Sequence, residues 1–332
     1  MRYWLTLERG IIQLLQVKIQ KRPTSMHCPD KESVYHIPVM LGECLEGLRI
    51  DPDGCYVDVT FGGGGHSRAI VEKLSSKGRL YGFDQDADAQ NNTIADERFT
   101  LIQQNFKYLR QYLRFYGVTE VDGVLGDFGV SSHQFDVAER GFSTRFEGAL
   151  DMRMNQKAPL TAQQVVNEYD EQALADLLYR YGELKNARAI ARTIVACRQN
   201  NPITLGSELQ AALQPLLPKF KENKILAQIY QAIRIEVNGE IEALESFLLQ
   251  LPAVVKVGGR ISLISYHSLE DRAVKRFIRD GQLEGTPEKD WYGNISVPFK
   301  KVGGLITPSE SEIAQNNRAR SAKLRIAERI ND

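Results

Sequence analysis

The 332-residue chain lacks the features that mark several common protein classes. It has only four cysteines, and no two have the short spacing of a zinc site, so neither a metal motif nor a disulfide framework is indicated. It has no run of about 18 apolar residues, which excludes a membrane-spanning helix. Lys and Arg equal Asp and Glu at 42 each, which argues against a uniformly basic nucleic-acid binder. We therefore expect a cytoplasmic globular protein that needs neither membrane nor metal.

Short apolar runs bounded by glycines and acids predict strands along much of the chain. These runs cover 54–61, 78–86, 98–106, 121–129, 258–268 and 320–330. Helical spacing follows two of them, over 66–74 and 269–280. Strands that alternate with helices predict βαβ units and a parallel sheet, which is an α/β fold.

The pattern changes between 136 and 236, where strand signals are weak and helical spacing dominates. Thr161 and Gln164 have the spacing of a capping box at the start of one such helix. We interpret 136–236 as an all-helical insertion. The parts that carry the sheet are then 27–135 and 237–332, and they follow an N-terminal extension, 1–26.

The stretch "VDVTFGGGGHS" places four glycines, beginning at Gly62, directly after the first predicted strand. The dinucleotide pattern G-x-G-x-x-G does not match because its third glycine is missing. A phosphate-binding loop would need a Lys directly after the glycines, and the first Lys that follows them is Lys73. An acid, Asp58, stands four residues before Gly62, a spacing similar to the first motif of Rossmann-like methyltransferases. Asp84 ends the second predicted strand, where an acid can accept hydrogen bonds from ribose hydroxyls, and Asp127 ends the fourth.

Longer segments carry a more specific resemblance. "VDVTFGGGGHS", "GDFGVSSHQFDVAERGFS", "YGELKNARAIARTIV", "GGRISLISYHSLEDRAVKRF" and "RARSAKLRIAER" resemble the RsmH (MraW) family over about 36–330. These are 16S ribosomal RNA cytosine-N4 methyltransferases. The resemblance implies a Rossmann-like class I sheet that binds S-adenosyl-L-methionine, with 136–236 recognising RNA. It also implies N4-methylation of a cytosine in the decoding centre (P site) of 16S rRNA. We expect the assembled small ribosomal subunit to be the substrate, with free RNA as the alternative.

The same resemblance implies the residues of the site. Cofactor contacts map onto Gly64, Gly65, His66, Asp84, Phe106, Asp127 and Gln134. Phe106 supplies a ring that can stack beside adenine. Asp127 and His267 are the candidate catalytic residues, since either could accept a proton from the cytosine amine. The Pro-Pro pair that DNA amino-methyltransferases carry at this strand end is missing after Asp127. No metal is needed for the reaction.

Two stretches are locally basic in a chain of zero net charge. Each holds five Lys or Arg residues and one acid, over 180–198 and 318–329. We therefore predict RNA contacts at Arg188, Arg192, Arg318 and Arg320. The alternative for these arginines is that they form surface ion pairs. The alternatives for the function are that the methyl acceptor is another RNA or a protein, or that the chain binds RNA without catalysis.

Overall fold

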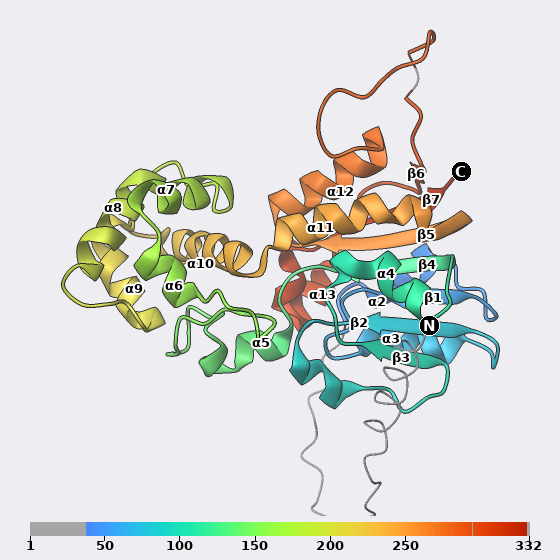
Figure 1. Ribbon diagram of the computed structural model, residues 1–332, viewed down its shortest axis with the longest axis horizontal. Coiled ribbons are helices and arrows are strands. Elements are labelled where there is room, and N and C mark those ends of the chain that lie inside the picture. Colours follow the sequence, from blue (N-terminus) through green and yellow to red (C-terminus); the bar gives the residue numbers. More distant parts are fainter. Residues whose placement is uncertain (1–37, 294, 331–332) are drawn as a thin grey trace, which may run out of the picture. The chain divides into compact units, whose positions relative to one another are not determined.

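A computed structural model describes residues 38–293 and 295–330, which fold around one seven-stranded sheet (Figure 1). Its strands are β1 (Cys55–Asp58), β2 (Arg79–Phe83), β3 (Phe99–Ile102), β4 (Val121–Asp127), β5 (Val255–Ser265), β6 (Phe299–Lys301) and β7 (Lys323–Arg329). They lie in the order β3-β2-β1-β4-β5-β7-β6. Strands β1 to β5 are parallel, whereas β7 is antiparallel to both neighbours. The order of the parallel strands confirms the predicted Rossmann-like α/β fold.

Two details differ from the sequence prediction. The C-terminal strand, predicted over 320–330, is β7, and it reverses the direction of an otherwise parallel sheet. The sequence does not signal β6, because three residues are too few to show a period-two pattern. The predicted extension, 1–26, lies outside the described residues.

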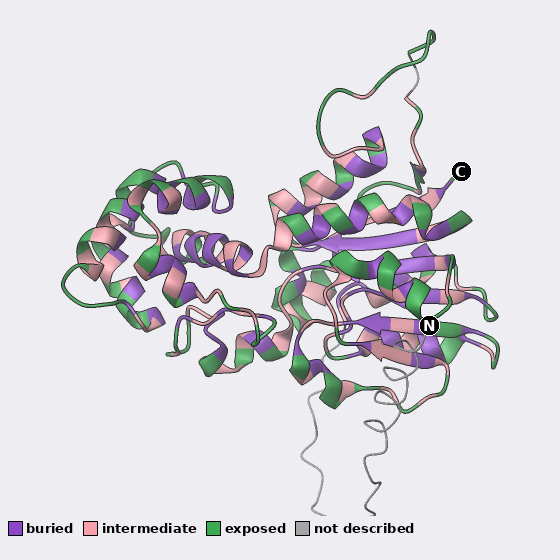
Figure 2. Ribbon diagram, viewed as in Figure 1, coloured by how far each residue is buried: buried purple, intermediate pink, exposed green. Residues whose placement is uncertain are grey.

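Helices cover both faces of the sheet. On one face lie α2 (Leu41–Leu48) and α3 (Gly65–Lys73), and on the other lie α4 (Leu109–Phe115), α11 (Glu240–Gln250) and α12 (Ser268–Asp280). Side chains alternate between the faces of a strand, so neighbours on β1 enter different cores. Tyr56 shares one core with Ile70 of α3. Val57 shares the other with Leu109 of α4 and Phe247 of α11. Figure 2 shows the central strands mostly buried between these layers.

The chain between β4 and β5 is helical, and the predicted division of the chain into domains stays a prediction. It contains α5 (Ser132–Asp136), α6 (Ala162–Glu168), α7 (Glu171–Arg180), α8 (Ala187–Arg198), α9 (Gly206–Leu213) and α10 (Glu222–Asn238). Residues of α6 to α10 share a hydrophobic core of their own. The predicted capping box is confirmed: Gln164 N donates to Thr161 Oγ1 at 3.2 Å, and Thr161 N donates to Gln164 Oε1 at 3.0 Å.

Short elements complete the described chain. They are α13 (Glu310–Gln315) and the 3₁₀ helices η2 (Ala87–Asn92), η3 (Phe106–Tyr108), η4 (Ala138–Arg140), η5 (Gln214–Leu216), η6 (Leu251–Ala253) and η7 (Asn317–Ser321). Gly239, at a φ of 57°, separates α10 from α11 and lies close to the predicted border at 236. Glu183 joins the helical segment to α12, because Ser268 Oγ and Arg272 Nη2 both donate to its carboxylate, at 2.5 and 2.6 Å.

Among the described residues, no helix combines the length and the apolar character needed to cross a membrane.

Candidate active site

Four consecutive glycines form a turn between β1 and α3 at the carboxyl edge of the sheet. Gly62 and Gly64 have positive φ angles of 51° and 76°, a conformation that favours glycine. A Cβ added to Gly63 would meet no other part of the protein within 4 Å, so the backbone there is open to a ligand. A Cβ added to Gly65 would overlap the ring of Pro38. The turn is therefore open at Gly63 and tightly packed at Gly65.

Three carboxylates end neighbouring strands beside this turn. Asp58 is the last residue of β1, Asp127 is the last of β4, and Asp84 follows β2. Parallel strands bring their carboxyl ends to one edge of the sheet, so the three acids lie together. Asp58 is 1% exposed and accepts hydrogen bonds from Ser67 Oγ at 2.7 Å and from Thr60 N at 3.1 Å. Asp58 thus stabilises the start of α3, and the more exposed Asp84 and Asp127 remain available to a ligand.

Asp84 is held by two backbone amides. Its Oδ2 accepts a hydrogen bond from Gly62 N and its Oδ1 accepts one from Asp86 N, both at 2.8 Å. Burial raises the pKa of Asp84 to about 6, although both hydrogen bonds act to lower it. The carboxylate fixes the glycine turn, and each oxygen keeps a second lone pair for a hydroxyl donor. This geometry allows the predicted ribose contact, which stays a prediction.

Asp127 lies between a hydroxyl group and an imidazole. Tyr266, which follows the neighbouring strand β5, donates its hydroxyl to Asp127 Oδ1 at 2.7 Å. On the other side, His66 Nδ1 lies 3.9 Å from Asp127 Oδ2. Burial raises the pKa of Asp127 to about 6, opposed by the charge of His66 and by the Tyr266 hydrogen bond. A carboxylate with this pKa is ionised at neutral pH and is still basic enough to accept a proton.

His66 connects α3 to this acid. Its side chain is buried, and its Nε2 lies 3.0 Å from the carbonyl oxygen of Val39. A carbonyl oxygen can only accept a hydrogen bond, so we assign a proton to Nε2, and Nδ1 faces Asp127. His66 therefore acts on the site through Asp127. Its predicted contact with the cofactor stays a prediction.

A buried network that the sequence did not reveal supports the loop after β2. Asp86 is 4% exposed, and its Oδ2 accepts hydrogen bonds from Gln134 Nε2 and Arg140 Nη2, both at 2.7 Å. Gln134 Oε1 accepts from Ser131 N at 3.1 Å and so caps α5. Both ends of the Gln134 amide are thus engaged within the protein. We infer that Gln134 and Arg140 position Asp86, whose backbone holds Asp84, and a direct cofactor contact by Gln134 stays a prediction.

Phe106 lies further from its strand than the sequence indicates. Strand β3 ends at Ile102, and Asn105 begins η3 by accepting a hydrogen bond from Lys107 N at 2.9 Å. The half-buried ring of Phe106 packs against Phe128, with ring centroids 5.8 Å apart. Because Phe128 directly follows Asp127, this packing brings Phe106 to the edge where the acids lie. Its predicted place beside adenine stays a prediction.

His267, the second catalytic candidate, caps α12 instead of ending β5, which stops at Ser265. Its Nδ1 accepts a hydrogen bond from Glu270 N at 3.4 Å. Its Nε2 lies 3.2 Å from Glu270 Oε1, although the two groups are not aligned as a hydrogen bond. Burial acts to raise the pKa of Glu270, but the neighbouring His267 and several hydrogen bonds lower it overall. Both ring nitrogens thus face Glu270, which favours a capping role over proton transfer.

The side chains of Glu240, His267 and Glu270 converge, with one potential ligand atom from each lying within 4.8 Å of the others. Arg234 donates to both oxygens of Glu240, at 2.8 Å each. Its buried guanidinium already supplies positive charge here and would repel a metal ion. The cluster therefore fits a metal poorly, and the expected lack of a metal stays a prediction.

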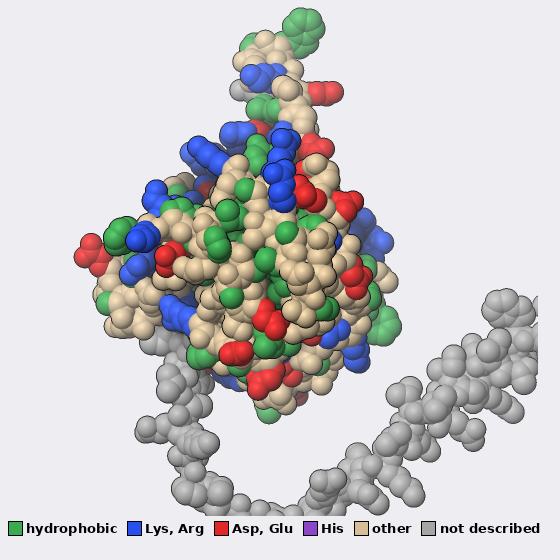
Figure 3. Space-filling view, turned by 90° about the vertical axis from the view of Figure 1, so that its left-hand side faces the viewer, with side chains coloured by type: hydrophobic (Ala, Val, Ile, Leu, Met, Phe, Trp, Pro, Cys, Tyr) green, Lys and Arg blue, Asp and Glu red, His purple; other side chains and the backbone are tan. Residues whose placement is uncertain are grey.

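The four arginines predicted to contact RNA divide into two kinds. Arg192 lies 3.4 Å from a glutamate of α7, and Arg318 lies 2.5 Å from Asp136. Arg188 and Arg320 are exposed, and no carboxylate of the described chain lies within 4.0 Å of either. Figure 3 views the molecule from the side of α8, and there Lys and Arg side chains are intermingled with Asp and Glu. Of the four predicted RNA contacts, Arg188 and Arg320 thus lack a carboxylate partner within the described chain, and RNA contact by all four stays a prediction.

Comparison with known proteins places the chain in a family. The model of the MraW methylase family matches residues 33–330. A ribosomal RNA small subunit methyltransferase H from Christiangramia forsetii is 66% identical over 296 residues, which cover 89% of this chain and 98% of the relative. Proteins of the same name from Flavobacterium johnsoniae and Parabacteroides distasonis are 60% and 54% identical, covering 89% and 91% of this chain and 98% and 99% of those relatives. The family match and these identities extend over the sheet, the glycine turn and the helical segment alike, and the chain belongs to the MraW methylase family.

Proposed function

We propose that this chain is an S-adenosylmethionine-dependent methyltransferase that methylates N4 of a cytosine in the decoding centre of 16S rRNA. The observation that carries the proposal is the position of Asp127 beside the glycine turn, where its carboxylate accepts a hydrogen bond from the Tyr266 hydroxyl at 2.7 Å. Doubly wound sheets bind their ligands at this carboxyl edge. The relatives named ribosomal RNA small subunit methyltransferase H support the choice of substrate.

The residues around the glycine turn fit the cofactor. Gly63 leaves the backbone open, and Asp84 offers carboxylate lone pairs to ribose hydroxyls. Asp127 offers negative charge to a cationic ligand, and the half-buried ring of Phe106 offers an aromatic face to adenine. When bound, S-adenosylmethionine supplies a methyl group that is activated by the positive charge of its sulfonium.

The task of the protein side chains is to make the cytosine amine react. The N4 lone pair is delocalised into the ring, so the amine is a weak nucleophile and must be aligned. Asp127, when ionised, accepts a hydrogen bond from N4 and takes its proton as the new N–C bond forms. Tyr266 holds that carboxylate in one orientation. The cytosine must leave its stack to reach this edge of the sheet.

The assembled small subunit, in the cytoplasm, is the proposed setting. The helical segment between β4 and β5 has its own core and carries Arg188 exposed on α8. Structured RNA is recognised largely through its shape and its phosphates, which suits a separate helical surface of this kind.

A transfer assay tests the proposal. Small subunits that lack the modification are incubated with methyl-labelled S-adenosylmethionine and either wild-type protein or Asp127→Asn. We expect the wild type to label 16S rRNA, and the variant to be at least about 100-fold slower because it has lost its proton acceptor. Label in ribosomal protein, or an unchanged rate for the variant, would contradict the proposal.

A further inference from the structure

The chain between β3 and β4 differs in charge from the rest of the protein. From Arg98 to Thr119 it carries four basic residues and no acid, although acids and bases balance over the whole chain. Arg98 is neutralised by Asp96, at 2.6 Å. The other three basic residues are Lys107, Arg110 and Arg114, which lie on η3 and α4.

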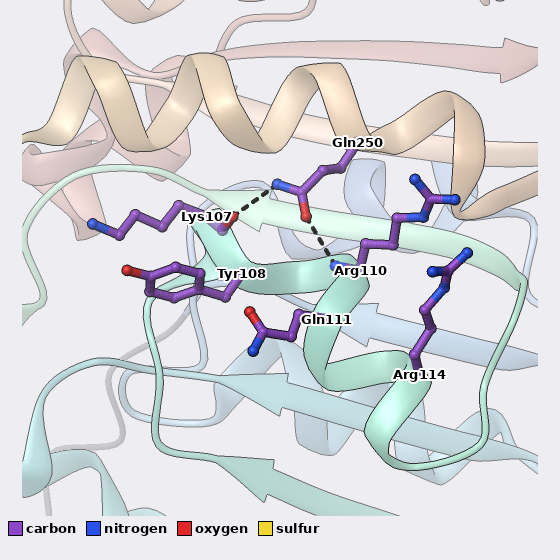
Figure 4. A pocket seen from close by; sticks show the side chains of 6 residues that line it. All are labelled: Lys107, Tyr108, Arg110, Gln111, Arg114 and Gln250. Carbon is purple, nitrogen blue, oxygen red and sulfur yellow. Dashed lines mark hydrogen bonds between the residues drawn. The ribbon is translucent and has the colours of Figure 1, made fainter.

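These three residues border a hollow of about 470 Å³ between α4 and the end of α11 (Figure 4). Tyr108, Gln111 and Gln250 complete its lining. Gln250 joins the two helices, since its Oε1 accepts from Arg110 N at 2.9 Å and its Nε2 donates to Lys107 O at 2.8 Å. The backbone that carries the basic side chains is therefore fixed, while the side chains themselves extend outward.

The positive charges of the hollow are not neutralised by the protein. All three basic residues are exposed, and no carboxylate of the described chain lies within 4.0 Å of Lys107, Arg110 or Arg114. The ammonium of Lys107 instead lies 5.1 Å from the ring centroid of Tyr108. Unpaired cations that surround a hollow form a site for anions, and phosphate is the anion that such clusters commonly bind.

Exposed aromatic rings accompany the cations. Tyr108 is 41% exposed, and Phe115 and Tyr116 at the end of α4 are 80% and 42% exposed. These rings alternate along the chain with the unpaired cations Lys107, Arg110 and Arg114. Cationic grooves interleaved with aromatic rings are typical of surfaces that bind single-stranded nucleic acid, where phosphates meet the cations and bases stack on the rings.

We propose that the α4–α11 hollow binds unpaired RNA, with Lys107, Arg110 and Arg114 on the phosphates and Tyr108 stacked on a base. This inference rests on the proposed RNA substrate and adds a docking surface outside both basic stretches recognised in the sequence. The hollow begins directly after Phe106, so RNA bound there lies next to the proposed adenine end of the cofactor site.

The test compares two double variants that remove the same charge from opposite faces of the sheet. Arg110→Gln/Arg114→Gln alters the hollow, and Lys73→Gln/Lys77→Gln alters the end of α3 and the loop behind it on the other face. Affinity for small ribosomal subunits that lack the modification is measured across a salt series. We expect the salt slope of the first variant to fall by about two, near one per phosphate contact, and that of the control to stay at the wild-type value.

Tyr108→Ala, measured at fixed salt, should weaken binding by about 5- to 150-fold, and Tyr108→Phe should restore it, because stacking requires the ring and not the hydroxyl. A salt slope of Arg110→Gln/Arg114→Gln equal to that of the wild type would overturn the docking surface. Equal decreases of the salt slope in both double variants would overturn it as well. Failure of the wild type to bind or methylate subunits would instead refute the proposed function. Circular dichroism melting of each variant shows whether the exposed substitutions leave the fold intact.

Discussion

Replacing Tyr266 by Phe should shift the pH dependence of methyl transfer. The substitution keeps the ring, which packs against Gly129, and removes the hydroxyl that donates to Asp127 Oδ1 at 2.7 Å. That hydrogen bond stabilises the ionised carboxylate, so its loss raises the pKa of Asp127 above about 6. The base works only when ionised. The rate therefore falls as pH drops through the pKa, and the variant loses activity at a higher pH than the wild type.

The size of the shift follows from the strength of the bond. A hydrogen bond to a charged group contributes about 1.5–3 kcal/mol, and one pKa unit corresponds to about 1.36 kcal/mol, so we expect a shift of at least about one unit. A rise of one unit from about 6 would reduce the ionised fraction at about pH 6 from one half to near one tenth. The rate should then fall about fivefold at that pH and change little above about pH 8.

Single-turnover methyl transfer to small subunits, followed from about pH 5 to pH 9, measures this midpoint. The other groups that act on Asp127 are unchanged by the substitution; they are His66, Asp58 and Glu270. Cofactor affinity at the alkaline end serves as the control and should match the wild type. A midpoint that stays in place or moves to lower pH would refute the role of Tyr266 and weaken that of Asp127 as the base.

Three further predictions follow from the geometry. Asp84→Ala should weaken S-adenosylmethionine binding by about 1.5–3 kcal/mol, and calorimetry that shows unchanged affinity with an intact fold would exclude the ribose contact. Gly65→Ala should lower the free energy of unfolding by about 1–3 kcal/mol because its Cβ overlaps Pro38, whereas Gly63→Ala should leave stability unchanged and reduce cofactor affinity. Denaturant unfolding measures the stability of both variants, and calorimetry measures their cofactor affinity. Equal stability losses would argue against an open ligand site at Gly63. Neutralising Arg188 or Arg320 should reduce the salt slope of RNA binding by about one each, and unchanged slopes would move the contacts elsewhere.

Local patterns predicted the glycine turn and the acids around it. A strand that ends in glycines and a second strand that ends in an acid are both short-range signals. In the structure Asp84 accepts a hydrogen bond from Gly62 N at 2.8 Å, a contact that was not predicted. The parallel order of the strands then brings Asp127 to the same edge. These features depend on residues that lie within or next to the strands, which is why the sequence could reveal them.

Tertiary pairing could not be predicted in the same way. Asp86 and Arg140 are 54 positions apart, and neither forms part of a motif that indicates their contact. Arg318 lies 2.5 Å from Asp136, which is 182 positions away, a pairing that no local pattern indicates. The positive charge of 98–119 is visible in the sequence, but only the structure shows that Lys107, Arg110 and Arg114 have no carboxylate of the described chain within 4.0 Å.

His267 shows how a strand boundary predicted from sequence can misplace a candidate residue within the fold. The sequence placed it in a strand over 258–268, where its side chain could face a ligand. Strand β5 ends at Ser265, and His267 caps α12 with its Nδ1 accepting from Glu270 N. The neighbouring Tyr266 donates to Asp127 Oδ1, and the catalytic role of His267 stays a prediction.

The most direct test of the proposed activity is the chemical identity of the methylated nucleoside. Purified protein and S-adenosylmethionine are added to small subunits from a strain that lacks this protein, and the 16S rRNA is digested and mapped by mass spectrometry. We predict that N4-methylcytidine appears at one position, in the decoding centre, and is absent when the protein is omitted. A methyl group on the cytosine ring carbon, on another nucleoside or on a ribosomal protein would contradict the proposal that Asp127 activates a cytosine amine.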